Sequence, residues 1–283
     1  MNLFKKINPI EDTIFIKESL VFKKYKLINK IGKGAFGKVY SVQNINNQKT
    51  FAMKIEPLSS KNSNLQTEAF YLFSLQGFGI PKFITFGHNK TYNILVEELL
   101  GKSLDFIFIK NNIKCTLNDA FLIVIQLIER FQWIHSKDII YRDLKPENCL
   151  IGKDNPNTIY LIDFGLCKKY RSSKTGKHIL PKRTDKFSGT MKFTSFYALS
   201  GKEQSRRDDL ISLGYMLIFL VKKNLPWNYD LNYIEKEKYE KLVKNKRNHG
   251  NGSLFNNIPK EFEEYIRYTY NLKFEQEPNY EYL

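Results

Sequence analysis

The sequence predicts an α+β fold, with strands as far as about residue 98 and helices dominating after it. Before residue 98, a helical stretch at about 63–75 interrupts a series of strand-like runs. After it, apolar residues at 121–128 recur at the spacing of a helix that buries one face. The apolar run at 210–221 is too short to span a bilayer and is bounded by charges, so we interpret it as a buried helix. The strand-like runs are 25–30, 39–44 and 51–56.

Length and composition fit one catalytic unit without a membrane segment. A chain of 283 residues can bury a substantial core. The 3 cysteines, Cys115, Cys149 and Cys167, lack the paired spacing of a disulfide framework or a zinc site. Acidic residues interrupt the N-terminal segment, which argues against a signal peptide. We therefore expect a cytoplasmic or nuclear protein, or one found in both, with no membrane partner.

A glycine loop joins the first two strands. Gly32, Gly34 and Gly37 lack Cβ atoms, so backbone amides can approach phosphate groups closely. The same spacing serves dinucleotide-binding turns, but there a helix opens directly after the last glycine. Here the residues after Gly37 alternate like a strand, which favours a hairpin lid over phosphates. The alternative is an ordinary hairpin turn.

The third strand carries Ala52 and Lys54 on one face, because side chains two residues apart point the same way. A small residue such as Ala52 suits the floor of an adenine pocket. The helical stretch that follows contains Glu68, whose carboxylate can pair with Lys54 and fix its ammonium on phosphates. The alternative is that Glu68 is a solvated helix residue.

Two strings in the helical part are the most informative. The first runs from Tyr141 to Asn148 (YRDLKPEN), and Asp163-Phe164-Gly165 follows about 20 residues after Asp143. Phosphoryl transfer needs a carboxylate to orient the attacking hydroxyl, an amide and a second carboxylate for magnesium, and a cation on the phosphates. Asp143, Asn148, Asp163 and Lys54 supply these groups in the order typical of protein kinases.

With these motifs the chain resembles eukaryotic protein kinases, and specifically the casein kinase I family. The Ala-Pro-Glu string of other kinases is absent, which is itself typical of that family. The resemblance runs from about residue 25 to the C-terminus. The strings typical of the family are Gly79-Ile80-Pro81, Ile134-His135-Ser136-Lys137, and Glu203 to Leu210 followed by Ser212-Leu213-Gly214-Tyr215.

The resemblance implies a bilobal kinase fold. It places an N-terminal extension at 1–24, a small and mainly antiparallel β lobe with one key helix at 25–98, and a larger, mainly α-helical lobe at 99–283. Compared with the family, the chain stops short of the last helix, which we expect to be truncated.

The implied activity is a serine/threonine protein kinase that uses ATP and Mg²⁺. Asp143 is implied to orient and deprotonate the substrate hydroxyl, and Lys145 to contact the transferring phosphate, which favours Ser/Thr over Tyr. Asn148 and Asp163 are implied to hold magnesium. The residues implied to surround or bind the nucleotide are Ile31, Gly32, Gly34, Gly37, Val39, Ala52, Lys54, Glu68, Glu98, Leu100 and Leu150.

The formal net charge is +16. Scattered lysines on a solvated surface would explain it, as would steering of acidic or already phosphorylated protein substrates, which the family prefers. Specific nucleic-acid binding is not expected, because no recognisable module is present. The basic run 241–247 is interpreted as an exposed helix end, with a nuclear signal as the alternative. A monomer is expected, although no sequence feature fixes the oligomeric state. The residues suited to attracting an acidic substrate are Lys182, Arg183, Lys186 and Lys192.

Three departures from the family pattern stand out. Tyr141 replaces a histidine, as in other active kinase groups. Glu97 stands at the gatekeeper position, where the family commonly has methionine, and we expect it to compete with Glu68 for Lys54. Leu231 replaces a lysine of the phosphate-recognition pocket, whose arginine Arg183 supplies, so a requirement for primed substrates is in doubt. The alternative function is a pseudokinase that binds nucleotide as a scaffold.

Overall fold

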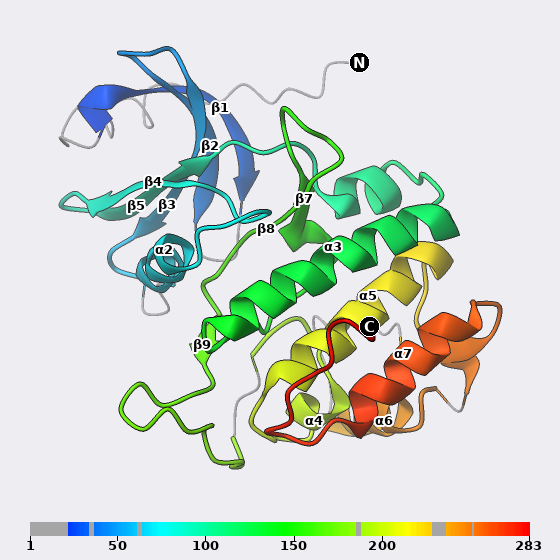
Figure 1. The fold of residues 1–283 in the computed structure, drawn as a ribbon. Coiled ribbons are helices and arrows are strands. Elements are labelled where there is room, and N and C mark those ends of the chain that lie inside the picture. The colour runs from blue at the N-terminus through cyan, green and yellow to red at the C-terminus, as the bar shows by residue number, and fades with distance from the viewer. Residues whose placement is uncertain (1–21, 34–36, 61–63, 185–187, 228–235, 251) are drawn as a thin grey trace. The chain divides into compact units, whose positions relative to one another are not determined.

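The structure, a computed structural model of the chain, describes residues 22–33, 37–60, 64–184, 188–227, 236–250 and 252–283. The chain divides into two compact units, Met1–Leu100 and Gly101–Leu283, here called the small and the large unit. In its described residues the small unit contains a five-stranded sheet, one α-helix and one short helical segment, and the large unit is mainly helical (Figure 1). The predicted α+β fold, with a β-rich lobe and a helical lobe, is confirmed.

The sheet of the small unit has the order β1-β2-β3-β5-β4, and every neighbouring pair is antiparallel. Alternate side chains along the strands point to the same face of the sheet, and the core of the unit gathers on one of the two faces. The strands are β1 (Tyr25–Lys33), β2 (Lys38–Asn44), β3 (Thr50–Pro57), β4 (Phe83–His88) and β5 (Tyr92–Glu98). The core of the unit consists of Tyr25, Tyr40, Val42, Met53, Ile55, Ile94 and Val96.

Helix α2 (Leu65–Ser74) is the key helix of the small unit, at the place where the sequence predicts one. The Glu56 carboxylate of β3 accepts the backbone N–H of Leu65, the first residue of the helix, at 3.0 Å. A carboxylate at a helix N-terminus satisfies a free donor and complements the helix dipole. The end of β3 therefore fixes where α2 begins.

The large unit combines helices with short strand pairs. Strand β6 (Ile139–Ile140) pairs with β9 (Lys168–Lys169), and β7 (Cys149–Ile151) pairs with β8 (Ile159–Leu161). The α-helices are α3 (Leu117–Ser136), α4 (Phe196–Leu199), α5 (Arg206–Lys222), α6 (Lys236–Arg247) and α7 (Lys260–Asn271). Shorter helical segments are η1 (Phe22–Lys24) in the small unit, and η2 (Asp105–Lys110), η3 (Pro146–Asn148) and η4 (Ser253–Phe255) in the large unit.

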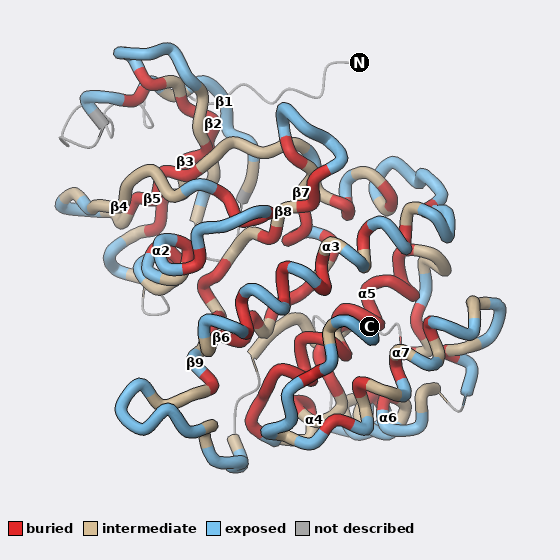
Figure 2. The backbone as a smooth tube through the Cα atoms, in the orientation of Figure 1, coloured by how far each residue is buried: buried red, intermediate tan, exposed pale blue. Residues whose placement is uncertain are grey.

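Helix α5 is the centre of the large unit. It contacts both α3 and α7, and its residues from Arg206 to Leu220 are buried except Ser212, as Figure 2 shows in red. A helix that is buried on all sides belongs to the interior of a domain. The predicted buried helix at 210–221 is confirmed. Within the described part of the chain, no helix is long and apolar enough to cross a membrane.

Helix α3 begins at a capping box formed by Thr116 and Asp119 and buries one face, as predicted. Leu127 is completely buried, but Leu122 and Ile125 are 56% and 57% exposed. The buried stripe instead follows a helical repeat through Ala120, Ile123, Leu127, Phe131 and Ile134. The apolar run 121–128 therefore belongs to the core only in part, because it winds around the helix.

Candidate active site

Lys54 of β3 lies between two carboxylates of the small unit. Its Nζ forms an ion pair with Glu68 of α2, and a second one with Glu97 of β5 at an Nζ–Oε1 distance of 3.1 Å. Register explains the second pair: Glu97 is opposite Ala52, so it is a diagonal neighbour of Lys54 on the same sheet face. The Glu68 and Glu97 side chains are only 8% and 5% exposed, so both charges are largely removed from water.

The predicted nucleotide residues of the small unit lie close to this lysine in the sheet. Val39 of β2 is opposite Lys54 on one side and Gly32 of β1 on the other. Gly37 precedes β2, and a Cβ there would lie 2.1 Å from the carbonyl oxygen of Ile55, so only glycine fits. The other predicted positions in β1 and β3 are Ile31, which is exposed, and Ala52, which is buried, whereas Gly34 lies outside the described residues.

The last strand of the small unit ends at the predicted adenine-edge residues. Glu98 is the last residue of β5, and its backbone N–H donates to the carbonyl oxygen of Lys82 at 2.9 Å. Its carboxylate accepts the backbone N–H of Lys82 at 3.0 Å. These two bonds fix the conformation of the segment that leads to Leu100, where the small unit ends.

In the large unit, Asp143 is the centre of a cluster of polar side chains. Lys145 Nζ lies 2.7 Å from its Oδ2. Asn148 donates from Nδ2 to the backbone oxygen of Asp143 at 3.0 Å and to Oδ2 at 3.3 Å. Burial alone would lower the pKa of Lys145, but Asp143, followed by Asp163 and Glu147, raises it above the ordinary value. Lys145 therefore remains a cation beside the carboxylate at neutral pH.

Asp163 is brought to the same end of the unit by backbone pairing. The N–H of Ile162 donates to the carbonyl oxygen of Asn148 at 3.0 Å, so the residue after it lies beside the Asp143 cluster. Asp163 itself has a φ of +63°, a left-handed conformation that costs energy in a residue with a side chain. Leu150, the predicted adenine contact of the large unit, lies in β7 and bridges to Ser103.

Tyr141 stabilises the Asp163 turn. Its hydroxyl donates to the carbonyl oxygen of Ile162, and its ring packs edge-on against Phe164 at a centroid distance of 5.7 Å. Burial, followed by the nearby carboxylates of Asp163 and Asp143, raises the pKa of Tyr141 well above its ordinary value, so the phenol stays a donor. The tyrosine found in place of histidine thus joins the two catalytic strings.

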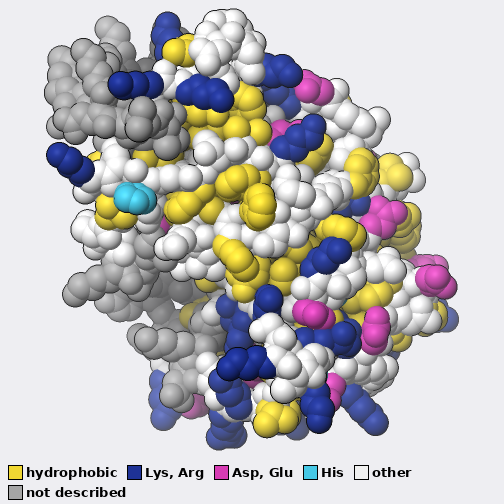
Figure 3. Space-filling view, turned by 60° about the vertical axis from the view of Figure 1, so that its left-hand side comes forward, with side chains coloured by type: hydrophobic (Ala, Val, Ile, Leu, Met, Phe, Trp, Pro, Cys, Tyr) yellow, Lys and Arg dark blue, Asp and Glu magenta, His cyan; other side chains and the backbone are white. Residues whose placement is uncertain are grey.

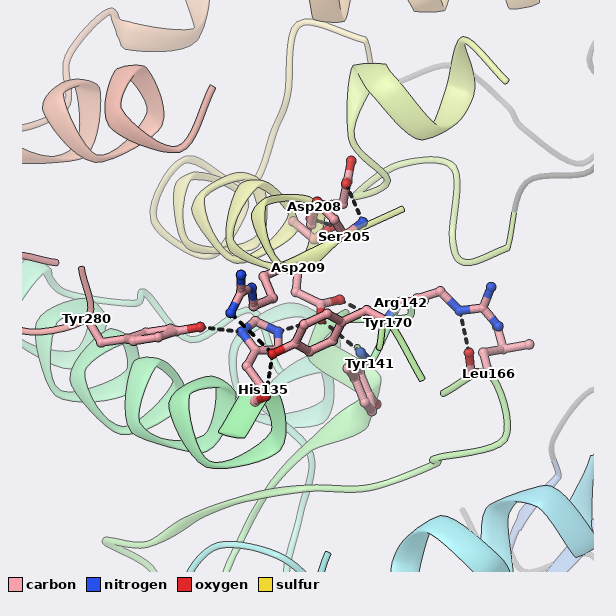
Figure 4. A network of polar contacts seen from close by, with 11 residues as sticks. His135, Tyr141, Arg142, Leu166, Tyr170, Ser205, Asp208, Asp209 and Tyr280 are labelled. Carbon is pink, nitrogen blue, oxygen red and sulfur yellow. Dashed lines mark hydrogen bonds and ion pairs between the residues drawn. The ribbon is translucent and has the colours of Figure 1, made fainter. Parts of the chain in front are cut away.

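Asp209 of α5, which the sequence reasoning missed, holds the backbone before Asp143 (Figure 4). Its carboxylate accepts the N–H of Tyr141 at 2.8 Å and that of Arg142 at 2.7 Å. His135 Nε2 lies 2.9 Å from the same carboxylate, and its Nδ1 lies 2.7 Å from the hydroxyl of Tyr280. A carboxylate accepts only, so Nε2 carries the proton and Nδ1 accepts from Tyr280.

Burial lowers the pKa of His135 despite the hydrogen bond to Asp209, so the ring is neutral at physiological pH. The neutral ring fits both contacts, since one nitrogen donates and the other accepts. Arg142 has a φ of +74° and donates from Nε to the carbonyl oxygen of Leu166 at 2.6 Å. This left-handed residue is held by Asp209 on one side and by Leu166 on the other.

Thr190 is a second site residue that the motifs did not reveal. Its hydroxyl donates to Oδ1 of Asp143 at 2.8 Å. The preceding Gly189 has a φ of +113°, and a Cβ on it would lie 2.3 Å from the carbonyl oxygen of Arg142. Only glycine fits at position 189, because the backbone is left-handed there and lies close to Arg142.

The basic residues expected to attract acidic substrates differ in their surroundings. Lys182 and Arg183 are exposed, whereas Lys186 and Leu231 lie outside the described residues. The ammonium of Lys192 lies 3.5 Å from the centroid of the Phe219 ring, and burial lowers its pKa. Figure 3 shows Lys and Arg side chains spread over one face of the molecule, with acidic side chains between them.

The residues that could hold a metal ion are Asn148 and Asp163. Among the described residues, no group of three or more His, Cys, Asp or Glu side chains could hold a metal ion. Mg²⁺ prefers oxygen ligands and is usually bound through one or two protein groups together with substrate phosphates. The donors of the Asn148 amide point to Asp143, and its oxygen with the carboxylate of Asp163 makes a set that fits Mg²⁺.

Residues 25–279 match the family model described as the protein kinase domain. The matched range contains all the residues described in this section except Tyr280.

Proposed function

Since the chain belongs to the protein kinase domain family, whose members are phosphotransferases that use ATP and Mg²⁺, we propose that it is a serine/threonine kinase of the casein kinase I type. The proposed reaction transfers the γ-phosphoryl group of ATP to Ser or Thr hydroxyls of acidic or already phosphorylated proteins. The observation that carries the proposal is the cluster around Asp143, whose two carboxylate oxygens are oriented by Lys145, Asn148 and Thr190.

In this proposal Asp143 is the general base. Its carboxylate orients the substrate hydroxyl and finally accepts its proton. Lys145 remains a cation because of its acidic neighbours, and it offsets negative charge on the transferring phosphate. The hydrogen bonds from Asn148 and Thr190 hold the base in position before substrate binds, which lowers the cost of organising the site during reaction.

The nucleotide would be bound by the residues that the kinase motifs supply. Asn148 and Asp163 would hold Mg²⁺, which supplies charge neutralisation at the phosphates when bound. Lys54, oriented by Glu68, would contact the α- and β-phosphates, beneath the loop that contains Gly32 and Gly37. The proposed contacts of the adenine are Ile31, Val39, Ala52 and Leu150, with backbone groups of Glu98 and Leu100 at its edge.

The substrate preference is proposed from two features. Lys145, two residues after the base, is typical of serine/threonine kinases rather than tyrosine kinases. The exposed Lys182 and Arg183 precede Thr190 in the chain, and such cations attract acidic or phosphorylated peptides. The family strings at 203–215 support the casein kinase I type, as does the absence of an Ala-Pro-Glu string.

A second candidate function is a nucleotide-binding scaffold without catalytic activity. The observation that favours it is the ion pair between Glu97 and Lys54, because a lysine held by two carboxylates is less available to phosphates. A scaffold would bind Mg²⁺–ATP without transferring phosphate.

The deciding experiment measures transfer from labelled ATP to casein, an acidic protein, by the wild type and by Asp143→Asn. Loss of a general base should lower the rate by about 10²- to 10⁴-fold. Asp154→Asn is the matched control, since Asp154 is exposed, and it should leave the rate unchanged. Equal labelling by wild type and Asp143→Asn would refute catalysis by this site, and with retained Mg²⁺–ATP binding it would favour the scaffold.

A further inference from the structure

Lys246 is a buried lysine in the large unit, outside the catalytic strings. It lies in the last turn of α6, in the basic run interpreted as an exposed helix end, and its exposed fraction is 0%. The run does end a helix, but the expectation of exposure is wrong for Lys246. Its neighbour Lys244 on the same helix is exposed.

The ammonium of Lys246 donates to carbonyl oxygens of one short segment. The acceptors are Met191 at 2.8 Å, Lys192 at 3.1 Å and Thr194 at 2.5 Å. The three carbonyls converge on one side-chain nitrogen, which has three N–H donors when protonated and two when neutral. The segment is therefore bound to α6 through a single side chain.

Aromatic rings complete the surroundings of this ammonium. The ring centroids of Tyr215 and Trp227 lie 4.9 Å and 5.1 Å from Nζ, within the range of a cation–π interaction. Trp227 also donates from Nε1 to the carbonyl oxygen of Lys192 at 3.0 Å. In the described part of the chain, no carboxylate lies within ion-pair distance of Lys246. Burying a charge without an ion-pair partner costs free energy of folding. We therefore look for the role of Lys246 in the conformation of the segment that it holds.

The other end of the segment reaches the proposed base. Thr190 donates to Asp143, and Gly189 packs against the backbone of Arg142. The N–H groups of Phe193 and Thr194 both donate to the carbonyl oxygen of Thr190 at 2.9 Å, which makes residues 190–194 one compact turn. A shift at the Lys246 side of this turn would therefore move the groups next to Asp143.

We propose that Lys246 is a positioning residue for the protein substrate, because it fixes residues 189–194, the segment that contacts the proposed base Asp143. This inference rests on the proposed kinase function. It assigns to α6 an effect on peptide binding and phosphoryl transfer, and no effect on nucleotide binding, since the segment contacts Asp143 through Thr190.

The first test is hydrogen–deuterium exchange of the whole protein without substrates. Lys246→Met keeps the length of the side chain and removes its donors, and Lys244→Met is the matched control on the same helix. We expect faster exchange in residues 189–195 of Lys246→Met and no change in the control. Unchanged exchange in 189–195 would overturn the proposal, whether or not the protein transfers phosphate.

The second test separates the two substrates in steady-state kinetics. A misplaced binding segment should lower kcat/KM for an acidic peptide by about 10- to 100-fold in Lys246→Met, with the KM for ATP within about twofold of wild type. Equal losses toward peptide and ATP would indicate a merely structural role and would contradict positioning. An inactive wild type would refute the proposed function, and the exchange test would still decide the conformational claim.

A milder variant keeps the proposal testable if Lys246→Met does not fold. Trp227→Phe removes one hydrogen bond to Lys192 but leaves the ammonium in place. We expect the effects of Lys246→Met in a weaker form, namely faster hydrogen–deuterium exchange in residues 189–195 and a raised KM for the peptide. Faster exchange elsewhere in the large unit, with unchanged exchange in residues 189–195, would overturn the proposal.

Discussion

Lys54 and Lys246 are two lysines whose burial is compensated in different ways. Lys54 pairs with the carboxylates of Glu68 and Glu97, and its side chain is still 14% exposed. Lys246 is completely buried, and its partners are three backbone carbonyls and two aromatic rings. Carboxylates stabilise a cation that a ligand can still reach, whereas carbonyls use up every donor. The first arrangement suits the binding of phosphates, and the second suits the holding of a chain segment.

The largest expected difference between the two lysines is in the pH dependence of stability. Burial lowers the pKa of Lys246 well below its ordinary value of 10.5 in the folded state. Between the folded-state pKa and about 10.5, the unfolded chain binds more protons at this position, so the free energy of unfolding rises with pH. One proton contributes at most about 1.4 kcal/mol per pH unit. Lys246→Met should lack this contribution.

The measurement is urea unfolding of wild type and Lys246→Met from pH 7 to 10. The difference between the two proteins should grow with pH in favour of wild type. The titratable neighbours are Tyr215 and Tyr270, whose pKa values burial raises, and both proteins contain them, so their contribution cancels. A difference that stays constant over this range would show that Lys246 has the same protonation in both states.

The second prediction concerns the carboxylates beside Lys54. Glu97→Met removes an anionic partner of Lys54, which leaves the ammonium more available to phosphates. The KM for ATP should fall by roughly threefold to tenfold, since a charge-assisted contact strengthened by about 1 kcal/mol has this effect. Glu68→Gln should act in the opposite direction, because Glu68 orients Lys54. An unchanged KM and an unchanged inhibitor profile in Glu97→Met would refute competition between the carboxylates.

The contrast between the lysines also separates what the sequence could predict from what it could not. The contacts of Lys54 with Glu68 and Glu97 were expected from the phosphoryl-transfer motifs and from the family resemblance, and the structure brings the three residues together. The hydrogen bonds from Lys246 to backbone carbonyls join residues more than 50 positions apart, and no local pattern encodes them. A basic run at the end of a helix predicts exposed side chains. Lys246 is buried because α6 packs against residues 191–194.

The same reason explains the other residues that the sequence did not reveal. Thr190 reaches Asp143 across 47 positions, and Asp209 reaches Tyr141 across 68. Both lie outside the motifs of phosphoryl transfer, although they fix the residues inside them. The division into a β-rich and a helical part was predictable because the periodicity of strands and helices is local. The contacts that hold the catalytic loop come from residues distant in the sequence, so they were not predictable in this way.

Asp209, like Lys246, is a buried side chain of the large unit that holds a backbone segment. The smallest effect that we predict concerns Tyr280, which is linked to Asp209 through His135. Lys246 donates to carbonyls, while Asp209 accepts two backbone N–H groups and the His135 ring. Tyr280→Phe removes only the hydroxyl that donates to His135 Nδ1. A buried acceptor left without its donor should cost about 1 kcal/mol, or a fall in melting temperature of about 2–4 °C.

Phosphate transfer by Tyr280→Phe should stay within about twofold of wild type, because the carboxylate of Asp209 still holds the backbone of Tyr141 and Arg142 by itself. Differential scanning calorimetry and the casein assay measure the two quantities on the same preparation. A tenfold loss of transfer at an unchanged melting temperature would contradict this division of roles. It would mean that Tyr280 sets the position of the catalytic loop through His135, in the way that we propose for Lys246 and residues 189–194.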